Sequence, residues 1–563
     1  MSMLDDRFDL CARARLGLSF LNSNVDRRRG CLPYFATMFK NDPAENRHDW
    51  PDFGDLTARY TEAFVMVRRM LGLDEPNDVE VAIRKLLLSY FDEGDGLSYR
   101  PKPGKPYYST ILQRMYDEHV AEGFDQSRVL WGLLAWYEDS QDPAIRTRIE
   151  QLVAGLDRVM VRCGEYGYYD RGTWPPGFVP EAGAEPMPHQ LYFAGSQIHP
   201  LVECARALGL ERAMELAQRL ANFVVHHSDY FFEDGSWNCP HGVGFGGCEQ
   251  DGHVHSRLAT IAGVASLAIA TGRDDLLQRA RLWYDWFVDG HCSSFGWSPE
   301  FLGRFGDAAE GCETCAVMDH IRCALIFAAG AGDLGLYEQV EKIARNQLVE
   351  NQLLDTSLIR NTVEEADTDN ACFHDVATMV YGGFAGWAGP NDFIGNCDHN
   401  HCLMNCCGPS GVRALYDVWS HAYSRDGDTL RVHILMDRDD EVLRIADHQP
   451  DRAEVSILAR AAGALFVSGR TWIDPTAVQI SINDRSVPAA QRDGYFNVGR
   501  VAPGDRVLIT APMAERTERV QVNGRDYRAT WRGDTVVEID PPGTEMPFYQ
   551  GRWPRSPGSG RSR

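Results

Sequence analysis

The sequence predicts an α/α barrel, a closed ring of helix pairs, followed by a carboxyl-terminal antiparallel β-sandwich. Up to about residue 420, apolar residues recur at helical spacings, and the helices repeat as pairs joined by a glycine turn. Beyond that point the period changes to two, which is typical of strands. We therefore expect an irregular segment packed on the barrel over 1–50, the barrel over 51–424, the β-sandwich over 425–550 and a disordered tail over 551–563.

The first helix is predicted from Asp55 onward. Leu56, Tyr60, Phe64 and Val67 follow at spacings of three and four, so they share one helix face. Further helices are expected over 79–91, 111–120, 129–137, 145–161 and 412–419.

Three later segments repeat one pattern, in which an apolar helix reaches a glycine and a second helix then begins. The first helices end at Gly209, Gly272 and Gly330, and the second ones begin at Glu211, at Asp274 and near Leu336. Repeated helix pairs form an open array or a closed ring, and the long loops between these pairs favour the ring.

Alternating apolar residues predict the strands of the second domain, over 429–434, 454–458, 477–482, 507–509 and 536–539. Turn sequences such as Asn483-Asp484 and Asn523-Gly524 separate them. Strands of this length and spacing predict a sandwich of common domain size.

Composition excludes several classes of partner. The net charge of −24 argues against a nucleic acid or an anionic membrane surface, because phosphate groups require a basic surface. We find no apolar run long enough to span a bilayer and no signal peptide after Met1, so we expect a cytoplasmic protein. Fifteen cysteines then indicate reduced thiols or metal ligands.

The adjacent cysteines Cys406 and Cys407 are the most unusual feature. A glycine, a proline and the helix over 412–419 follow them, which places both thiols at a helix N-terminus, where the dipole favours a thiolate. Glu313 and Cys315 precede another apolar run. Three sulfurs and a carboxylate suit tetrahedral zinc. The alternative interpretation is that the cysteines are small buried apolar side chains.

Several loops combine aromatic and polar residues, such as the segments 166–170, 236–238 and 295–300. Exposed aromatic faces beside polar groups are suited to sugars, although such aromatics can equally form core beneath the loops.

An ordered set of motifs over roughly residues 190–515 resembles the bacterial β-L-arabinofuranosidase family, glycoside hydrolase family 127. The motifs are Gly252-His253, Glu300-Phe301, Glu313-Thr314-Cys315-Ala316, Leu336-Tyr337-Glu338-Gln339 leading to Asn346, Cys406-Cys407 leading to Arg413, Ser481-Ile482-Asn483, and Gly494-Tyr495 leading to Gly504-Asp505. The first 180 residues match the family poorly.

The resemblance implies an (α/α)₆ barrel and a zinc-dependent, retaining, exo-acting glycosidase. Its zinc ligands would be Glu313, Cys315, Cys406 and Cys407. Cys406 would be the nucleophile. A retaining glycosidase needs a nucleophile on one face of the anomeric carbon and an acid/base on the other. A thiolate can serve as the nucleophile if zinc and the helix N-terminus keep it ionised.

Glu300 is the expected general acid/base, with Glu310 as its rival because the segment before Glu313 is shorter than in the family. His253 and Trp297 are the expected substrate-binding residues. The expected partner is a glycoside or oligosaccharide, with neither nucleic acid nor membrane, and a homodimer is compatible with the sequence.

Two other functions stay open at this stage. A sugar epimerase or lyase on the same barrel could use His253 and His255 as acid and base, without any need for the cysteines. A carbohydrate-binding protein with structural zinc would keep the cysteines and leave Glu300 without a role.

One stretch departs from the family. Where family members commonly have Gly-His-Leu-Ile-Glu, this chain has Gly195-Ser196-Gln197-Ile198-His199. A changed set of polar groups in a sugar pocket changes the preferred sugar. We therefore expect a glycone that differs from β-L-arabinofuranose, such as a related furanose or a modified pentose.

Overall fold

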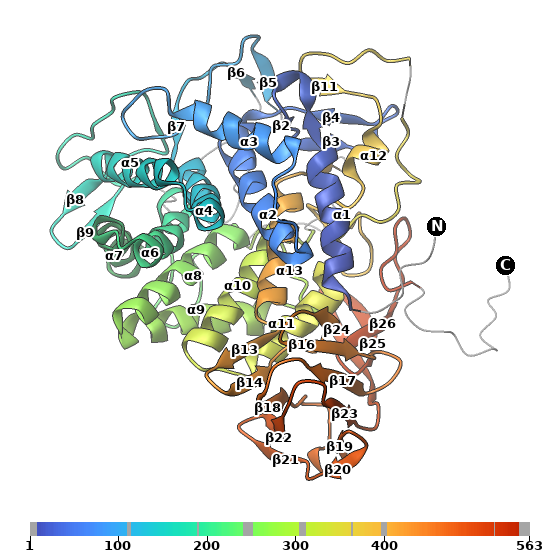
Figure 1. The fold of residues 1–563 in the computed structure, drawn as a ribbon. Helices are drawn as coiled ribbons and strands as arrows, with labels where there is room; N and C mark the ends of the chain where they lie inside the picture. Colours follow the sequence, from blue (N-terminus) through green and yellow to red (C-terminus); the bar gives the residue numbers. More distant parts are fainter. Residues whose placement is uncertain are drawn as a thin grey trace.

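The computed structural model describes residues 8–109, 114–187, 191–239, 252–302, 311–361, 364–395, 402–522 and 524–550. A helical barrel forms the larger part of the molecule, and a β-rich region lies beneath it (Figure 1). The tail predicted over 551–563 is outside the described residues.

Within the described ranges, six helices form an inner ring. They are α2 (Asp55–Leu71), α4 (Gly123–Ser140), α6 (Ser196–Leu208), α8 (Val254–Thr271), α10 (Thr314–Gly330) and α13 (Cys407–Ser420). Each packs against the next, and α13 packs back on α2, which closes the ring. Helices in such a ring are enclosed on all sides, so α8 and α10 are buried around nearly their whole circumference.

Outer helices cover the ring. They are α1 (Leu10–Ser23), α3 (Asp78–Leu88), α5 (Pro143–Val159), α7 (Glu211–His226), α9 (Asp274–His291) and α11 (Leu336–Ile343), with the short α12 (Val376–Val380) beside α1. The glycine repeats correctly predicted three inner–outer pairs, α6–α7, α8–α9 and α10–α11. Gly209 and Gly272 end their helices at φ 70° and 67°, a left-handed conformation that favours glycine.

Two predictions for the first 120 residues were wrong. The segment 1–50 contains a regular helix, α1, which packs against α2 and α13. The helix expected over 111–120 is absent where the structure describes that range; β5 (Tyr107–Ser109) and β6 (Arg114–Tyr116) form a hairpin instead. Tyr107 and Tyr116 pack inward, whereas their neighbours Tyr108 and Met115 are exposed, so the actual period is two.

A small sheet joins the N-terminal segment to the cysteine turn. Its order is β11 (Ala371–Cys372), β4 (Glu45–Arg47), β3 (Ala36–Met38) and β12 (Cys402–Met404). Immediately after β12, the backbone N–H of Asn405 donates to the Phe35 carbonyl at 2.6 Å. Its side-chain amide donates to the Tyr34 carbonyl and to Thr37, both at 2.9 Å. The start of α13 is therefore fixed by residues far away in the sequence.

The remaining short strands form two-stranded pairs in the connections. They are β1 (Val25–Asp26) with β2 (Leu32–Pro33), β7 (Ala121–Glu122) with β10 (Thr173–Trp174), and β8 (Val161–Cys163) with β9 (Tyr166–Tyr168).

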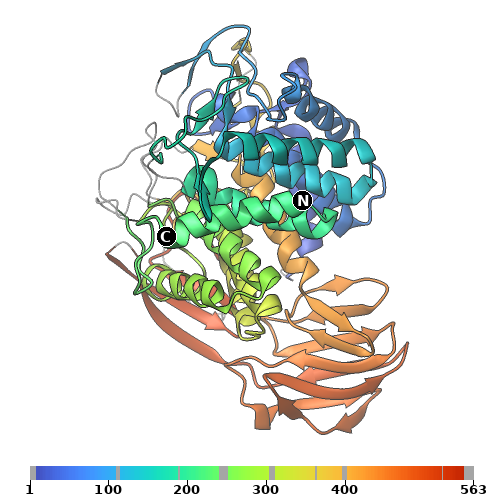
Figure 2. The same cartoon turned by 90° about the vertical axis from the view of Figure 1, so that its left-hand side faces the viewer.

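Two sheets after α13 form a sandwich around an apolar core of their own (Figure 2). The first sheet has the order β13 (Tyr423–Asp426), β14 (Thr429–Val432), β18 (Gly463–Ser468), β22 (Tyr495–Val501), β21 (Ala490–Arg492). The second has the order β15 (Arg438–Asp439), β16 (Leu443–Asp447), β17 (Glu454–Ala459), β23 (Arg506–Thr510), β19 (Gln479–Ile482), β20 (Arg485–Val487). The sheets are antiparallel as predicted, apart from the pair β14 and β18, which is parallel. The chain crosses to the second sheet between them and returns in the same direction.

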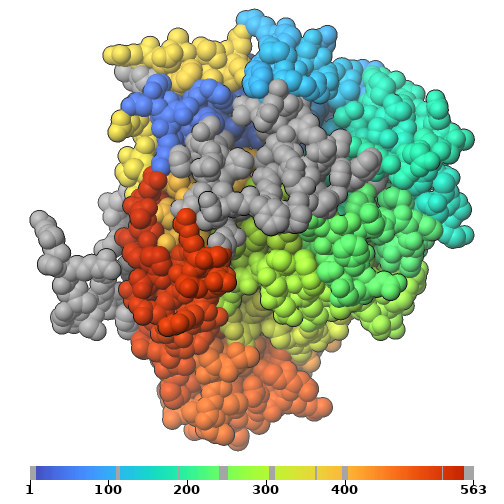
Figure 3. All heavy atoms as spheres, turned by 180° about the vertical axis from the view of Figure 1, so that it is seen from behind, coloured from blue at the N-terminus to red at the C-terminus, as the bar shows by residue number. Residues whose placement is uncertain are grey.

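The last three strands belong to the barrel rather than to the sandwich. They are β24 (Glu515–Val522), β25 (Arg525–Arg532) and β26 (Thr535–Asp540). Their buried side chains, such as Trp531 and Val536, are part of the barrel's core cluster. Figure 3 shows these residues in red along the side of the barrel, above the sandwich in orange. The segment predicted as one sandwich over 425–550 thus contains the two-sheet sandwich and, after it, the strands β24–β26 that pack on the barrel.

One inner helix, α8, is long and apolar enough to cross a membrane by length and composition, with a mean hydropathy of 1.3. The expectation that no segment would reach this length was wrong. However, 83% of this window is buried inside the fold, as expected for a helix of the inner ring.

Buried charges join the barrel to the β-region. Arg470, in the sandwich, forms ion pairs with Glu341 of α11 and, at 3.3 Å, with Asp534, between β25 and β26. Arg345 also pairs with Glu341, at 2.8 Å, and with Asp447 of the sandwich. Removing one member of a buried network leaves the others uncompensated, which destabilises more than the loss of an exposed pair.

We therefore expect Arg470→Met to lower the free energy of unfolding by about 3–5 kcal/mol. Arg492→Met is the matched control, because the Arg492–Asp493 pair is largely exposed, and we expect it to cost less than about 1 kcal/mol. Calorimetric unfolding of the three proteins measures both effects. Equal stability of the two variants would show that the buried network does not hold the β-region on the barrel.

Candidate active site

The N-termini of three inner helices meet at one end of the barrel. His253, Glu313 and Cys406 are the N-cap residues of α8, α10 and α13, and Cys315 and Cys407 lie in the first turns. Unpaired N–H groups and the helix dipole favour negative charge at such positions. The fold therefore gathers the predicted thiols and carboxylate at positions where the helix dipole favours negative charge.

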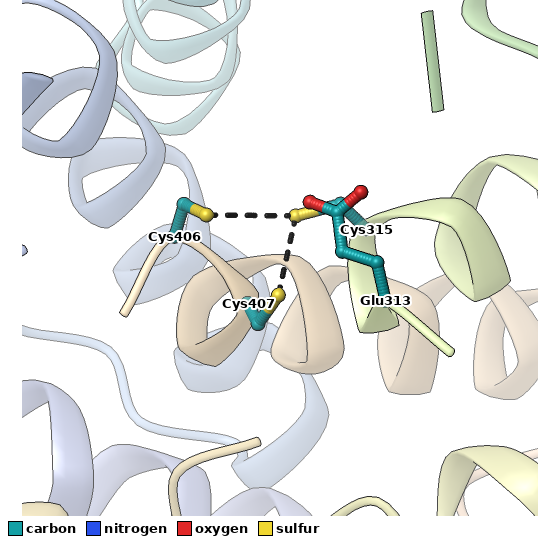
Figure 4. Close-up of side chains that lie close together, drawn as sticks. All are labelled: Glu313, Cys315, Cys406 and Cys407. Atoms are coloured by element: carbon teal, nitrogen blue, oxygen red, sulfur yellow. Dashed lines mark hydrogen bonds between the residues drawn. The ribbon is translucent and has the colours of Figure 1, made fainter. Parts of the chain in front are cut away.

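Glu313, Cys315, Cys406 and Cys407 converge as the sequence predicts (Figure 4). Their ligand atoms all lie within 4.8 Å of one another, and all four side chains are buried. The Cys315 sulfur lies 3.9 Å from that of Cys406 and 3.6 Å from that of Cys407. Residues separated by about ninety positions in the sequence thus form one cluster.

This donor set fits zinc. Tetrahedral zinc–sulfur bonds of about 2.3 Å place two sulfurs about 3.8 Å apart, close to the two separations seen here. Thiolate ligands favour zinc over harder cations such as magnesium and calcium. The Nε2 atom of His253 lies 3.2 Å from the Glu313 carboxylate, which is the kind of outer contact that orients a metal ligand.

The three thiols differ in acidity. Hydrogen bonds from Cys315 and Cys407 lower the pKa of Cys406 to about 6, although burial opposes this. Burial raises the pKa of Cys315 to about 12 and also raises the pKa of Cys407. Burial likewise raises the pKa of Glu313. Cys406 is thus the thiol of this cluster that ionises most readily.

Glu300 lies next to the cluster. Glu300, His253 and Glu313 have ligand atoms within 4.8 Å of one another, so Glu300 is on the same side of the barrel as the thiols. Its carboxylate accepts a hydrogen bond from the Trp387 indole at 2.5 Å, and the residue is 2% exposed. His253 stacks on Phe301, with the ring centres 4.9 Å apart. Glu310 lies outside the described residues.

Trp297 is buried, whereas the sequence of its loop suggested an exposed aromatic face that could stack on a sugar. It is 3% exposed, and its indole N–H donates to the Ala388 carbonyl at 2.9 Å. It is part of the barrel core, so we no longer propose it as a sugar-stacking residue.

Sequence reasoning missed Arg59, Ser410 and Trp387. Arg59 contacts the Cys315 thiol and Ser410, and Trp387 contacts Glu300. One signal could have revealed Arg59: it follows Leu56 by three positions, on the face that the apolar pattern predicts to be buried. A charged residue on such a face needs a buried partner.

His255 is enclosed in a network of charges below the thiols. Its Nδ1 atom bonds Asp319, and its Nε2 atom lies 2.7 Å from Arg128. Burial lowers the pKa of His255 to about 4, and despite burial the pair with His255 lowers that of Asp319 to about 2. Both ring nitrogens are already engaged, which argues against His255 as the acid or base of an epimerase.

The stretch 195–199 forms the N-cap and the first turn of α6, and its residues are buried. Ser196 donates to the Tyr192 carbonyl at 3.0 Å, and Gln197 donates to the Gly123 carbonyl at 2.9 Å. His199 is buried edge-on against Trp131. The polar side chains of Ser196 and Gln197 therefore bond to the backbone of the protein itself.

Solved structures show which proteins have a similar fold. No protein-family model matches the chain, and no curated protein matches its sequence. Among solved structures, however, the fold is similar to those of GH127 β-arabinofuranosidases.

One similar structure is a GH127 β-L-arabinofuranosidase from Geobacillus stearothermophilus T6, with 15% identity and a TM-score of 0.56 over 93% of this chain and 80% of that one. Another is a GH127 β-arabinofuranosidase with 14% identity and a TM-score of 0.58 over 93% and 79%. A D-mannose isomerase has 12% identity and a TM-score of 0.50 over 73% of this chain and 97% of that one.

Proposed function

We propose that this protein is a retaining, exo-acting glycoside hydrolase of the β-L-arabinofuranosidase kind, with its site on an (α/α)₆ barrel. The observation that supports this most strongly is the convergence of three thiols and one carboxylate beside a second buried glutamate. Zinc bound by Glu313, Cys315, Cys406 and Cys407 would keep the sulfurs ionised at neutral pH.

In the proposed reaction, Cys406 is the nucleophile and Glu300 is the general acid/base. The Cys406 sulfur attacks the anomeric carbon and forms a thioglycoside, while Glu300 protonates the departing oxygen. The leaving group is replaced by water, from which Glu300 takes a proton as the water cleaves the carbon–sulfur bond. The Trp387 indole donates a hydrogen bond to one carboxylate oxygen of Glu300 and so orients this side chain. His253 is proposed to bond a sugar hydroxyl.

The barrel also occurs in an isomerase, so the fold by itself does not select hydrolysis. The donor set does favour it, because an isomerase or epimerase needs an acid and a base but no cluster of three thiols. A carbohydrate-binding protein with structural zinc would need neither a readily ionised Cys406 nor the adjacent Glu300.

We further propose that residues 51–424 carry the chemistry and that the sandwich does not. The substrate is proposed to be a terminal furanose or modified pentose of a glycoside or oligosaccharide. Initial rates on a panel of aryl furanosides test the glycone. A wide preference for β-L-arabinofuranosides would show that the departure at 195–199 does not control specificity.

The zinc content of the purified protein tests the proposed metal site directly. Protein purified without added metal should contain about one zinc ion per chain, because the four donors form a complete ligand set. Elemental analysis measures this, with the double variant Cys406→Ser/Cys407→Ser as the comparison. Wild-type protein without zinc, or a double variant that retains it, would contradict the site.

A further inference from the structure

Two donors outside the ligand set contact one thiol of the cluster, Cys315. The Arg59 Nη1 atom lies 3.7 Å from its sulfur, and Ser410 Oγ lies 3.3 Å from it. Arg59 Nη1 also donates to Ser410 Oγ at 2.7 Å, so the two donors form a single unit. The sulfur of Cys315, once ionised, can accept hydrogen bonds from both.

Arg59 is held firmly in this position. Its Nε atom donates to Asp55 at 2.5 Å, and its Nη2 atom lies 3.3 Å from His255. The side chain is 5% exposed, so little solvent competes for these bonds. A guanidinium group stays charged at every accessible pH, and its planar fork fixes the direction of each N–H.

The negative charge of the proposed ligand set favours a cation nearby. Three thiolates and a carboxylate carry four negative charges, and a zinc ion offsets two of them. A buried excess of negative charge is unfavourable unless a cation is close. Arg59 donates a hydrogen bond directly to a sulfur of the cluster, which places its charge on the ligand side of the site.

The three sulfurs differ in their hydrogen-bond partners. Once a thiolate is fully ionised, hydrogen bonds from a cation stabilise it further and lower its intrinsic nucleophilicity. Cys315 has the contacts with Arg59 and Ser410, whereas Cys406 contacts the Cys315 thiol and, at 3.9 Å, the Met404 carbonyl. Among the described residues, neither donor makes a hydrogen bond to the Cys406 sulfur, which is proposed to attack the sugar, or to the sulfur of Cys407.

We propose that Arg59, with Ser410, is a positioning residue that stabilises Cys315 as a permanent metal ligand and so leaves Cys406 as the reactive thiolate. This inference rests on the proposed zinc–cysteine function. Arg59 acts through Cys315 and does not itself contact the substrate.

Arg59→Met tests the proposal, because methionine fills similar space without charge or donors. Zinc affinity, measured by competition with a chromogenic chelator, is expected to fall by about 10- to 100-fold, the usual effect of losing an outer contact to a metal ligand. Peptide mapping after iodoacetamide treatment of the zinc-loaded protein gives a second readout. We expect label on Cys406 in the wild type and on both Cys406 and Cys315 in the variant.

Arg128→Met is the matched control. Arg128 is also buried, at 4% exposure, and contacts the same His255 ring nitrogen at 2.7 Å, but no hydrogen bond joins it to a sulfur of the cluster among the described residues. We expect it to leave zinc affinity and the labelling pattern unchanged. If Arg59→Met does not fold, Ser410→Ala removes the partner donor, and a fall in zinc affinity of at least about threefold is expected.

Wild-type affinity and labelling in Arg59→Met, or in Ser410→Ala where the first variant does not fold, would overturn this inference while leaving the proposed function intact. An equal loss of affinity in Arg128→Met would assign the effect to general destabilisation and would also overturn it. A wild-type protein that binds no zinc would overturn the proposed function together with the inference.

Discussion

Cys406→Ser is expected to lower kcat/KM by on the order of 10⁴-fold or more, since loss of a catalytic nucleophile leaves only binding and orientation to accelerate the reaction. A serine hydroxyl is almost wholly protonated at neutral pH, whereas the surroundings of Cys406 lower its pKa to about 6. Steady-state rates on an aryl furanoside measure the loss.

Cys163→Ser is the control for this experiment. Cys163 is half-buried on β8 and is not part of the thiol cluster, so its replacement should leave the rate within about twofold of wild type. Retention of even a few per cent of wild-type activity by Cys406→Ser would show that another group attacks the sugar.

Glu300→Gln is expected to slow glycosides with poor leaving groups by about 10²- to 10⁴-fold, the usual contribution of a general acid. An aryl glycoside with a good leaving group needs little protonation, so its bond-breaking step should slow much less. Glutamine keeps the shape of the side chain and its contact with Trp387, which separates the loss of the proton from a loss of packing. Rates plotted against leaving-group pKa give the measurement.

Glu310→Gln, compared in the same assay, decides between the two glutamates considered from the sequence. We expect it to slow all substrates by a similar, small factor. If Glu310→Gln shows the steep dependence on the leaving group and Glu300→Gln does not, the acid/base has been assigned to the wrong residue.

The sequence predicted the barrel well because its helix pairs are local features. The apolar period of α6, α8 and α10 and the glycines that end two of these helices depend on neighbours within a few residues. The hairpin β5–β6 was mistaken for a helix because a short apolar run fits either period. The assignment of β24–β26 to the sandwich failed for another reason, since strand patterns do not specify which core a strand packs against.

The cluster of Glu313, Cys315, Cys406 and Cys407 could be predicted because its potential ligand groups are chemically unusual and come as two short motifs. Trp297 was misassigned because an aromatic residue in a polar loop has the same sequence pattern whether it stacks on a sugar or fills the core. Trp387 and Arg59 could not be assigned roles, because their partners Glu300 and Cys315 lie 87 and 256 positions away. Only the closed ring brings such residues together.

The most direct test of the proposed thiolate mechanism is the identity of the residue that becomes covalently glycosylated. An aryl 2-deoxy-2-fluoro furanoside slows hydrolysis of the intermediate, because fluorine destabilises the oxocarbenium-like transition state. Mass spectrometry of the zinc-containing protein should then find one sugar per chain, on the peptide that contains Cys406 and on the Cys406 sulfur. A sugar attached to a carboxylate, or turnover without any adduct and with inversion at the anomeric carbon, would contradict it.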